Sequence, residues 1–297
     1  MQPDRNTIDL DWGTVSYLTW QPTAPPVGPP VVLLHGGGVD NAWLSWGRLG
    51  ASLAEAGHRV YAPDHPGYGD SPLPPWQHTQ ERLVAYVGEV LDALGLDEVV
   101  LGGLSLGGGL TLGHALEHPD RVRRLMLFGS YGLADHQMDG PAAKVGNALS
   151  WALVRTGAME RIMRGAGTNR RLMRMSLRDI VRNPAEFTPE LFDAVLAETT
   201  RPDAFTAFGQ WQRDQILPGR LRTNYAPRLG EIHQPTLIVH GTHDSGVPVA
   251  RAREAAAALP DATLLVVDGA GHWVQRDRPD IVEPVVLDFL SGDQIRR

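Results

Sequence analysis

The stretch Gly103-Leu-Ser-Leu-Gly107 decides how this chain folds, because it joins a strand-like segment to a helix-like one. It follows the apolar run Glu98–Leu101, for which we expect a strand, and it opens the helix-like segment Ser105–Glu117. In a G-x-S-x-G turn of this kind the serine is held on a sharp, strained bend that exposes its hydroxyl, and the flanking glycines avoid clashes within the bend. The stretch therefore predicts that Ser105 is a nucleophile.

Two other interpretations of this turn are open. One is a glycine-rich strand–helix turn without a catalytic role, and the other is a nucleotide-binding loop. The chain contains no G-x-x-x-x-G-K-[ST] sequence, and these glycines do not fit G-x-G-x-x-G. A helix that begins at the serine also favours negative charge developing there. The nucleophile interpretation is therefore preferred.

Short apolar runs alternate with helix-like segments on both sides of the turn. This alternation predicts an α/β fold with a mostly parallel, twisted sheet and helices on both faces. The expected strands are Thr7–Asp11, Thr14–Trp20, Val31–Leu34, His58–Ala62, Glu98–Leu101, Val122–Phe128, Thr236–Val239 and Thr263–Val267. The expected helices are Trp43–Ala56, Glu81–Leu94, Ser105–Glu117, Ala250–Leu259 and Ile281–Leu290.

The alternation stops between residues 131 and 229, where no strand-like run occurs and the composition is helical. This segment also holds five of the seven methionines of the chain. We expect a core domain made of residues 1–130 and 230–297, interrupted by a helical lid at 131–229, since inserts above a sheet commonly gate its site. The alternative is a helical subdomain with an ordinary methionine-filled core.

A serine nucleophile needs a base, and the base needs a group that orients it. His272 lies in a glycine-flanked loop after the last expected strand, and Asp244 lies just after the strand Thr236–Val239. The carboxyl ends of parallel strands share one edge of the sheet, where ligands bind. The chain order Ser105, Asp244, His272 matches one known order of such triads. We therefore predict that these three residues are catalytic.

A glycine-rich segment, His35-Gly-Gly-Gly38, directly follows the strand Val31–Leu34. An oxyanion hole needs two backbone N–H groups aimed at one point, and glycines allow the backbone to approach a substrate closely. We expect the N–H groups of Gly37 and Leu106 to form this hole, the alternative being a tight turn with no donor role. Gly38, Trp43 and Trp273 are the predicted substrate-binding residues.

With these motifs the sequence resembles the α/β-hydrolase superfamily over about 7–130 and 230–292. The segments that carry the resemblance are His35–Gly38, Pro63–Ser71, Gly103–Gly107, Gly241–Pro248 and Gly271–Gln275. Among these hydrolases, it is most similar to the branch of meta-cleavage-product C–C hydrolases and esterases. The resemblance implies an α/β-hydrolase fold with a helical lid and a triad of Ser105, Asp244 and His272. Related epoxide hydrolases and haloalkane dehalogenases use an aspartate nucleophile, which Ser105 excludes.

Two positions depart from the C–C hydrolase pattern. Those enzymes carry asparagine before the nucleophile, where this chain has Leu104, and an arginine in the lid, which the matching region Glu190–Leu196 lacks. We therefore expect a serine hydrolase that cleaves a carboxylic ester, or a related acyl compound, of apolar or aromatic character. The alternatives are C–C bond hydrolysis of dienol-diketone ring-fission acids, acyl transfer, and a ligand receptor that retains the triad.

The composition excludes several other classes of protein. The 297 residues include no cysteine, which excludes disulfides, thiolate metal sites and a cysteine nucleophile. A net charge of −7 argues against nucleic acid as a partner. No apolar run reaches the length of a membrane span, and the N-terminus does not read as a signal peptide, so we expect a cytoplasmic protein, with a homodimer compatible.

We expect neither a cofactor nor a metal. His114-Ala-Leu-Glu-His118 matches an inverted zinc-protease pattern, but it lies on the helix after Ser105 and points away from the active edge of the sheet. We interpret both histidines as surface residues of an amphipathic helix. The lid arginines Arg170, Arg171, Arg174 and Arg178 are interpreted as a solvated face.

Overall fold

Three strands in the described part of the chain are buried along their whole length, as expected for the centre of a sheet that is covered on both faces. A computed structural model describes residues 1–136 and 143–292 of the chain. In it, one eight-stranded sheet has the strand order β1-β2-β4-β3-β5-β6-β7-β8. The strands are β1 (Asp4–Leu10), β2 (Gly13–Trp20), β3 (Val31–Leu34), β4 (Val60–Pro63), β5 (Val99–Leu104), β6 (Val122–Phe128), β7 (Thr236–Gly241) and β8 (Ala262–Val267).

The sheet is mostly parallel. β1 and β2 form an antiparallel hairpin, and β2 also runs antiparallel to β4, whereas all pairs from β4 to β8 are parallel. The parallel strands therefore direct their carboxyl ends to one edge. The α/β fold predicted from the alternation of apolar runs is confirmed.

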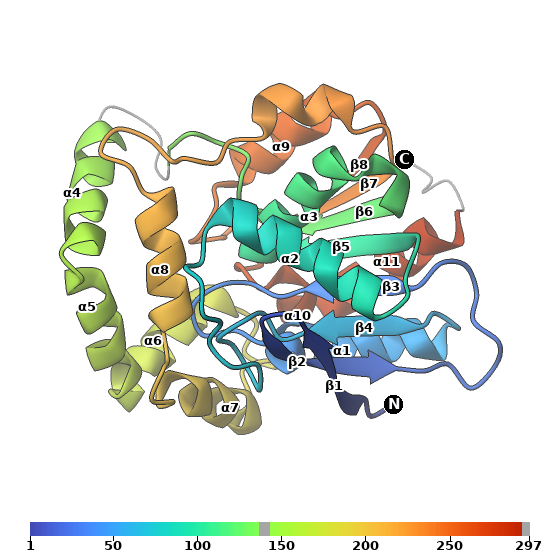
Figure 1. The fold of residues 1–297 in the computed structure, drawn as a ribbon, viewed down its shortest axis with the longest axis horizontal. Helices are drawn as coiled ribbons and strands as arrows, with labels where there is room; N and C mark the ends of the chain where they lie inside the picture. The colour runs from blue at the N-terminus through green and yellow to red at the C-terminus, as the bar shows by residue number, and fades with distance from the viewer. Residues whose placement is uncertain (137–142, 293–297) are drawn as a thin grey trace.

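Helices cover both faces of the sheet (Figure 1). Leu33 of β3 packs in a cluster with α1 (Ala42–Glu55) and α11 (Pro279–Ser291), while its neighbours Val32 and Leu34 pack on the opposite face with α2 (Gln80–Ala93) and α3 (Leu106–Glu117). The remaining core elements are α9 (Val249–Ala258), α10 (Val274–Asp277) and the short 3₁₀ helices η1 (Pro119–Arg121) and η2 (Ala226–Glu231). Successive side chains of a strand point to opposite faces, which explains this division.

Among the described residues, five α-helices lie between β6 and β7 in the chain and form the left side of the molecule in Figure 1. They are α4 (Ala143–Arg155), α5 (Ala158–Gly167), α6 (Arg170–Ile180), α7 (Pro189–Thr199) and α8 (Thr206–Gln215). Asn169 and Thr188 cap the N-termini of α6 and α7 through their side-chain oxygens. In the described ranges, no helix has both the length and the hydrophobicity needed to cross a bilayer.

The main difference from the predicted elements is at β5, which continues to Leu104 rather than ending at Leu101. Gly102 and Gly103 weaken the strand signal in the sequence, because glycine disfavours strands. Packing leaves little room for a side chain at either glycine, and least at Gly103. A Cβ at Gly102 would lie 2.9 Å from Leu33, and one at Gly103 would lie 2.2 Å from the backbone of Gly107.

The same close packing predicts the effect of a single methyl group. In Gly107→Ala, the added Cβ would lie 2.2 Å from the carbonyl oxygen of Leu34 and 2.6 Å from that of His35, so backbone must move. We expect a loss of about 1–3 kcal/mol in the free energy of unfolding, measured by urea denaturation.

Gly165→Ala is the matched control, since Gly165 is also helical and has no atom within 4 Å of the added Cβ. It should leave stability unchanged or raise it through helix propensity. Equal stability of the two variants would contradict the packing argument.

Candidate active site

Ser105 has a strained backbone at the junction of β5 and α3. Its φ is 51° and its ψ is −115°, and Phe205 is the only other non-glycine residue with positive φ in the described part of the chain. Such a conformation costs about 1–3 kcal/mol and persists only where the surroundings impose it. Here the Ser105 N–H donates to the carbonyl of Phe128 at 2.9 Å, and the Ser105 carbonyl accepts from the N–H of Tyr131 at 3.0 Å.

Asp244 and His272 are brought together from the loops that follow β7 and β8. Nδ1 of His272 lies 2.8 and 2.9 Å from the two carboxylate oxygens of Asp244. The N–H groups of Gly246 and Val247 donate to Oδ1 of the same carboxylate at 2.7 and 2.8 Å. The Asp244 side chain is only 1% exposed. The carboxylate is thus held by its own loop and faces the imidazole.

The two side chains shift each other's pKa. Burial acts to raise the pKa of Asp244, but attraction to His272 and hydrogen bonds from His240 and His272 outweigh burial and hold that pKa well below its ordinary value. For His272, burial acts to lower the pKa, but the charge and hydrogen bond of Asp244, together with the charge of Asp40, raise it above the ordinary 6.5. The imidazolium form is therefore stabilised in this site.

Ser105 and His272 line one cavity with Gly37 and Leu106, the two residues predicted to form an oxyanion hole. In the described part of the chain no hydrogen bond joins the Ser105 hydroxyl to the second ring nitrogen of His272; such catalytic contacts often tighten only with substrate bound. Leu106 is the first residue of α3, so its N–H has no partner within the helix. The predicted residues thus share one surface.

Asp40 is a buried carboxylate that the motifs of the sequence did not indicate. Its oxygens accept hydrogen bonds from the N–H of Gly36 at 2.7 Å, the N–H of Asn41 at 2.8 Å and the hydroxyl of Ser45 at 2.6 Å. Burial raises its pKa to about 6, and the hydrogen bonds oppose this. Asp40 closes the loop that carries Gly37, since it binds the backbone at both ends of that loop.

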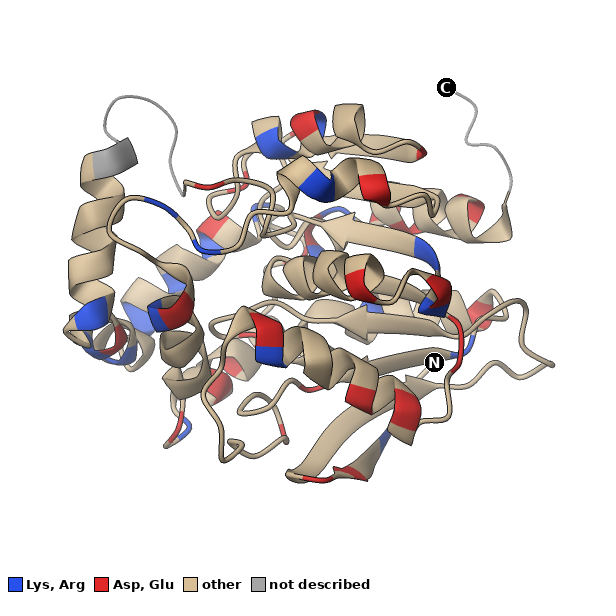
Figure 2. Cartoon of the chain, turned by 45° about the horizontal axis from the view of Figure 1, so that its top comes forward, with Lys and Arg blue, Asp and Glu red and all other residues tan. Residues whose placement is uncertain are grey.

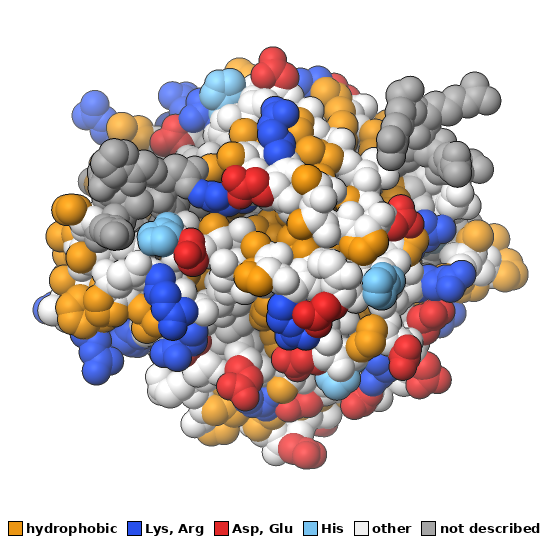
Figure 3. Space-filling model, turned by 90° about the horizontal axis from the view of Figure 1, so that it is seen from above, with side chains coloured by type: hydrophobic (Ala, Val, Ile, Leu, Met, Phe, Trp, Pro, Cys, Tyr) orange, Lys and Arg blue, Asp and Glu red, His pale blue; other side chains and the backbone are white. Residues whose placement is uncertain are grey.

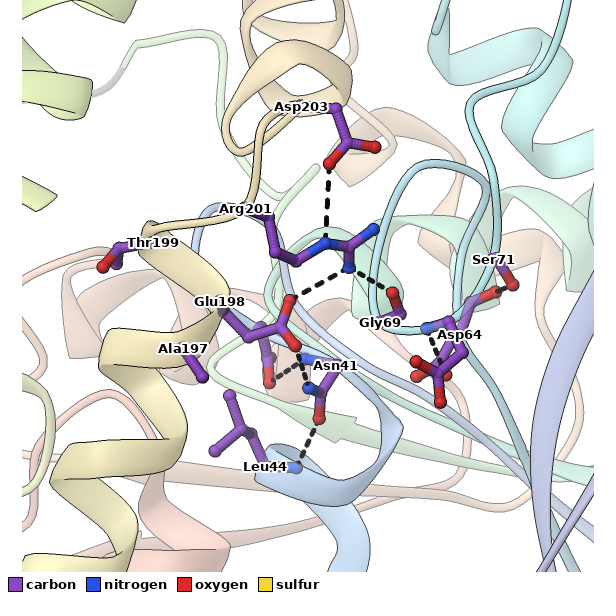
Figure 4. A network of polar contacts seen from close by, with 12 residues as sticks. Asn41, Leu44, Asp64, Gly69, Ser71, Ala197, Glu198, Thr199, Arg201 and Asp203 are labelled. Carbon is purple, nitrogen blue, oxygen red and sulfur yellow. Dashed lines mark hydrogen bonds and ion pairs between the residues drawn. The ribbon is translucent and has the colours of Figure 1, made fainter.

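The inserted helices contact this loop from the other side. A Cβ at Gly37 would lie 2.6 Å from the ring of Phe208 of α8, so any side chain at this position would displace that ring. Near by, Nδ2 of Asn41 donates to Glu198 at 2.9 Å, and Arg201 binds both Glu198 and the carbonyl of Gly69 (Figure 4). The end of α7 is therefore fastened to two loops of the core.

The cavity has a volume of about 410 Å³ and a largely apolar wall. The sheet edge supplies Ser105 and the loops around it, while the inserted helices supply apolar side chains that include Met163, Met173 and Phe208. Of the arginines and lysines in the described ranges, Arg251 alone lines this wall, and its guanidinium is paired with Glu254 at 2.8 Å.

The predicted substrate-binding residues divide into two groups. Gly38 and Trp273 line the cavity. Trp43 does not belong to the described wall; it lies on α1 and is 39% exposed. Trp43 follows the glycine loop in sequence, but the helix that begins at Asn41 turns its side chain away.

The histidines of the H-x-x-E-H segment differ from the expectation of a surface pair. His114 is fully buried, and burial lowers its pKa to about 4, whereas His118 is exposed. The face of α3 that carries His114 packs against α2, which the pattern in the sequence did not reveal. Within residues 1–136 and 143–292, no group of three or more histidine, aspartate or glutamate side chains could hold a metal ion.

Comparison with known proteins identifies relatives along most of the chain. The sequence model of the family described as alpha/beta hydrolase fold matches residues 29–279. The chain is 32% identical over 271 residues to 2-hydroxy-6-oxo-2,4-heptadienoate hydrolase of Pseudomonas putida, covering 90% of each chain. It is 29% identical over 280 residues to 2-hydroxy-6-oxo-6-phenylhexa-2,4-dienoate hydrolase of Burkholderia cepacia, covering 89% and 88%.

A solved structure supports the same fold. The 2-hydroxy-6-oxo-6-phenylhexa-2,4-dienoate hydrolase from Rhodococcus sp. strain RHA1 superimposes with a TM-score of 0.77 at 22% identity, covering 98% of this chain and 99% of the other.

The electrostatics of the site predict how His272 titrates. We expect its pKa to lie above the ordinary 6.5 and to fall in Asp244→Asn, because the anion that stabilises the imidazolium is removed. Asp40→Asn should lower it less, since Asp40 makes the smaller contribution. Nitrogen-15 NMR of the labelled imidazoles measures all three values. A wild-type pKa at or below 6.5, or one unmoved by Asp244→Asn, would contradict this account.

Proposed function

Because this chain belongs to the α/β-hydrolase fold family, we propose that it is a serine hydrolase that cleaves a carboxylic ester or a related acyl compound. The observation that carries the proposal is the strained Ser105 on the same cavity wall as His272, whose Nδ1 lies 2.8 Å from Asp244. A hydroxyl, a base and a carboxylate that orients the base are the parts that nucleophilic acyl transfer requires.

In the proposed mechanism, His272 accepts the proton of the Ser105 hydroxyl as its oxygen attacks the carbonyl carbon of the substrate. Asp244 holds the ring tautomer and stabilises the imidazolium that forms. The N–H groups of Gly37 and Leu106 bind the oxyanion. The partial positive charge at the N-terminus of α3 stabilises it further. The imidazolium then protonates the leaving group, and water resolves the acyl-enzyme through the same base.

We further propose that residues 131–229 act as a lid over the core formed by 1–130 and 230–297. Support comes from the cavity wall, to which α5, α6 and α8 contribute, and from the contact of Phe208 with Gly37. A closed lid excludes water and strengthens the electrostatic interactions within the site.

The largely apolar lining of the cavity favours a substrate with an apolar acyl group, either aromatic or aliphatic. Methionine and aromatic side chains of the inserted helices adapt to irregular apolar ligands. The relatives in Pseudomonas putida and Burkholderia cepacia are named for dienoate substrates, one of which carries a phenyl ring. An aromatic small molecule is therefore a natural probe.

C–C bond hydrolysis of a ring-fission acid is the second candidate. The names of these relatives favour it, and the described cavity wall includes one arginine, Arg251, whose guanidinium pairs with Glu254. Two features weigh against it. Leu104, next to the nucleophile, is a fully buried apolar residue, and the lid arginines Arg170, Arg171, Arg174 and Arg178 lie outside the described cavity wall.

Removal of the triad residues should abolish turnover. Ser105→Ala, His272→Ala and Asp244→Asn should each lower kcat/KM for an aryl ester by roughly 10⁴-fold. Wild-type activity should rise with pH, because His272 must lose its proton to act as the base, and the midpoint should lie above 6.5 since its pKa is raised. A loss below tenfold in Asp244→Asn would point to another carboxylate as the orienting group.

The contact of Glu198 with Asn41 should affect catalysis through the loop that carries Gly37 and is closed by Asp40. Glu198→Ala removes the acceptor for the Asn41 amide, which adjoins Asp40, and we expect kcat to fall about tenfold with a smaller change in KM. Glu198→Gln, which retains an oxygen acceptor, should restore most of kcat.

Glu186→Ala is the matched control for this prediction. Glu186 also lies between β6 and β7 and pairs with α1, because Arg48 of α1 is 3.0 Å from its carboxylate. Arg48 lies about two helical turns after Asn41, so this contact is remote from the loop that carries Gly37. It should leave kcat within about twofold. Equal losses in the two alanine variants would assign Glu198 to lid stability alone.

The two candidate functions differ in substrate preference. A carboxylate that lacks its arginine partner loses a charge-assisted hydrogen bond of about 1.5–3 kcal/mol. We therefore expect a higher kcat/KM for an aryl ester than for a dienol-diketone ring-fission acid, both measured at one pH. A preference of more than tenfold for the acid would promote the second candidate, and Arg251→Gln should then remove that preference.

A further inference from the structure

The charge of the molecule is distributed very unevenly. Residues 145–182, which include most of α4 and all of α5 and α6, contain eight arginines and two acidic residues, a net charge of +6. The whole chain carries −7, so the remainder carries −13. Figure 2 shows blue positions gathered on the helices at the left of the molecule. One end of the protein is therefore basic and the rest is acidic.

Five of these arginines have no carboxylate partner within the described residues: Arg155, Arg161, Arg171, Arg174 and Arg178. Arg174 and Arg178 lie over the rings of Phe192 and Phe187, at 4.8 and 5.5 Å from the ring centroids. Stacking on a ring holds a guanidinium at the surface without neutralising it. The positive charge of this end is thus available to an external anion.

Apolar side chains are exposed on the same helices. Of the ten large hydrophobic residues that are exposed in the described ranges, six lie on α4, α5 and α6. They are Val145 (72%), Leu149 (61%), Trp151 (36%), Ile162 (56%), Leu172 (45%) and Met175 (57%). At the left of Figure 3, hydrophobic and basic side chains adjoin each other on the surface.

Both α5 and α6 carry exposed apolar side chains in addition to the apolar side chains that line the cavity. Met163 of α5 and Met173 and Leu177 of α6 line the cavity at Ser105. Ile162 of α5 and Met175 of α6 are exposed instead, as are Arg161, Arg171 and Arg174 near them on the same helices. The first set of side chains faces a cavity, whereas no segment within residues 1–136 and 143–292 covers the exposed set.

We propose that the outer surface of α4, α5 and α6 binds peripherally to a bilayer that contains anionic lipids. Helices with exposed apolar side chains among arginines bind at the headgroup boundary, where the cations meet lipid phosphates and the apolar groups enter the acyl region. The acidic remainder of the chain is repelled by the same surface, which orients the molecule with these helices towards the lipid. The cavity then lies about one helix diameter, roughly 10 Å, from the bilayer.

An acidic protein would satisfy the arginines but not the exposed apolar side chains, which stand on convex helix surfaces outside the cavity. A second copy of this chain offers acidic surface to the arginines, but that surface leaves the exposed apolar side chains without apolar partners. A fluid bilayer accommodates both kinds of side chain without a complementary shape, which is why the observations favour lipid.

Cosedimentation of the full chain with vesicles tests the proposal and requires no turnover, so it is independent of the proposed hydrolase activity. Vesicles of phosphatidylcholine alone are compared with vesicles of phosphatidylcholine and phosphatidylglycerol in a three-to-one ratio. We expect at least tenfold stronger partitioning to the anionic vesicles at low salt, and loss of this difference at roughly 0.5 M NaCl.

Charge reversal locates the surface. Arg171→Glu with Arg174→Glu should reduce partitioning at least tenfold, whereas Arg123→Glu with Arg253→Glu, the same change in net charge on exposed core positions, should reduce it less than twofold. Leu172→Ser with Met175→Ser should also weaken binding, about fivefold, while leaving its salt dependence intact. Unchanged melting temperatures show that the variants are folded.

Three results would overturn the proposal. The first is partitioning that is equal for both kinds of vesicle or absent from both. The second is an equal loss in the α6 and core variants, which would make net charge alone responsible. The third is a dimer, detected by sedimentation velocity, that Arg171→Glu with Arg174→Glu dissociates in the absence of vesicle binding, which would assign the surface to a second copy of the chain.

Discussion

The close approach of the β5–α3 turn to the carboxyl end of β3 is the constraint on which the rest of the site depends. A Cβ at Gly107 would lie 2.2 Å from the Leu34 carbonyl oxygen, and one at Gly103 would lie 2.2 Å from the Gly107 backbone. With no side chains in the way, the turn is tight enough to hold Ser105 at a φ of 51°. The same contact brings the first residue of α3 beside the glycine loop after β3. One packing arrangement therefore fixes the backbone of Ser105 and places Leu106 next to Gly37.

Two buried carboxylates, those of Asp244 and Asp40, determine the electrostatics around His272. Asp244 remains ionised despite burial because its own loop and His272 donate to it, and its charge in turn favours the imidazolium. Asp40 is a second buried carboxylate, satisfied by the loop that it closes. A buried carboxylate is tolerated only when such partners are present. The helices between β6 and β7 connect to this arrangement through the hydrogen bond from Asn41 to Glu198 (Figure 4).

Much of the architecture could be predicted from the sequence, because its signals are local. Apolar runs and the G-x-S-x-G turn indicate the sheet, and parallel strands bring Ser105, Asp244 and His272 to one edge wherever the loops follow their strands. Other features depend on contacts between distant segments. Asn41 and Glu198 are 157 residues apart, and no local pattern relates them. Asp40 has no motif of its own, and the burial of His114 depends on how α2 packs against α3. Trp43 follows the glycine loop in sequence, but the direction of α1 places it outside the described cavity wall.

The central claim is that Ser105 becomes acylated during turnover. The most direct measurement is mass spectrometry of the protein after a rapid acid quench of its reaction with an aryl ester, followed by fragmentation of the peptide that contains Gly103–Gly107. The account predicts a mass increase equal to the acyl group, located on Ser105 and absent from Ser105→Ala. Turnover without any adduct on the time scale of the reaction, or an adduct on a different residue, would contradict it.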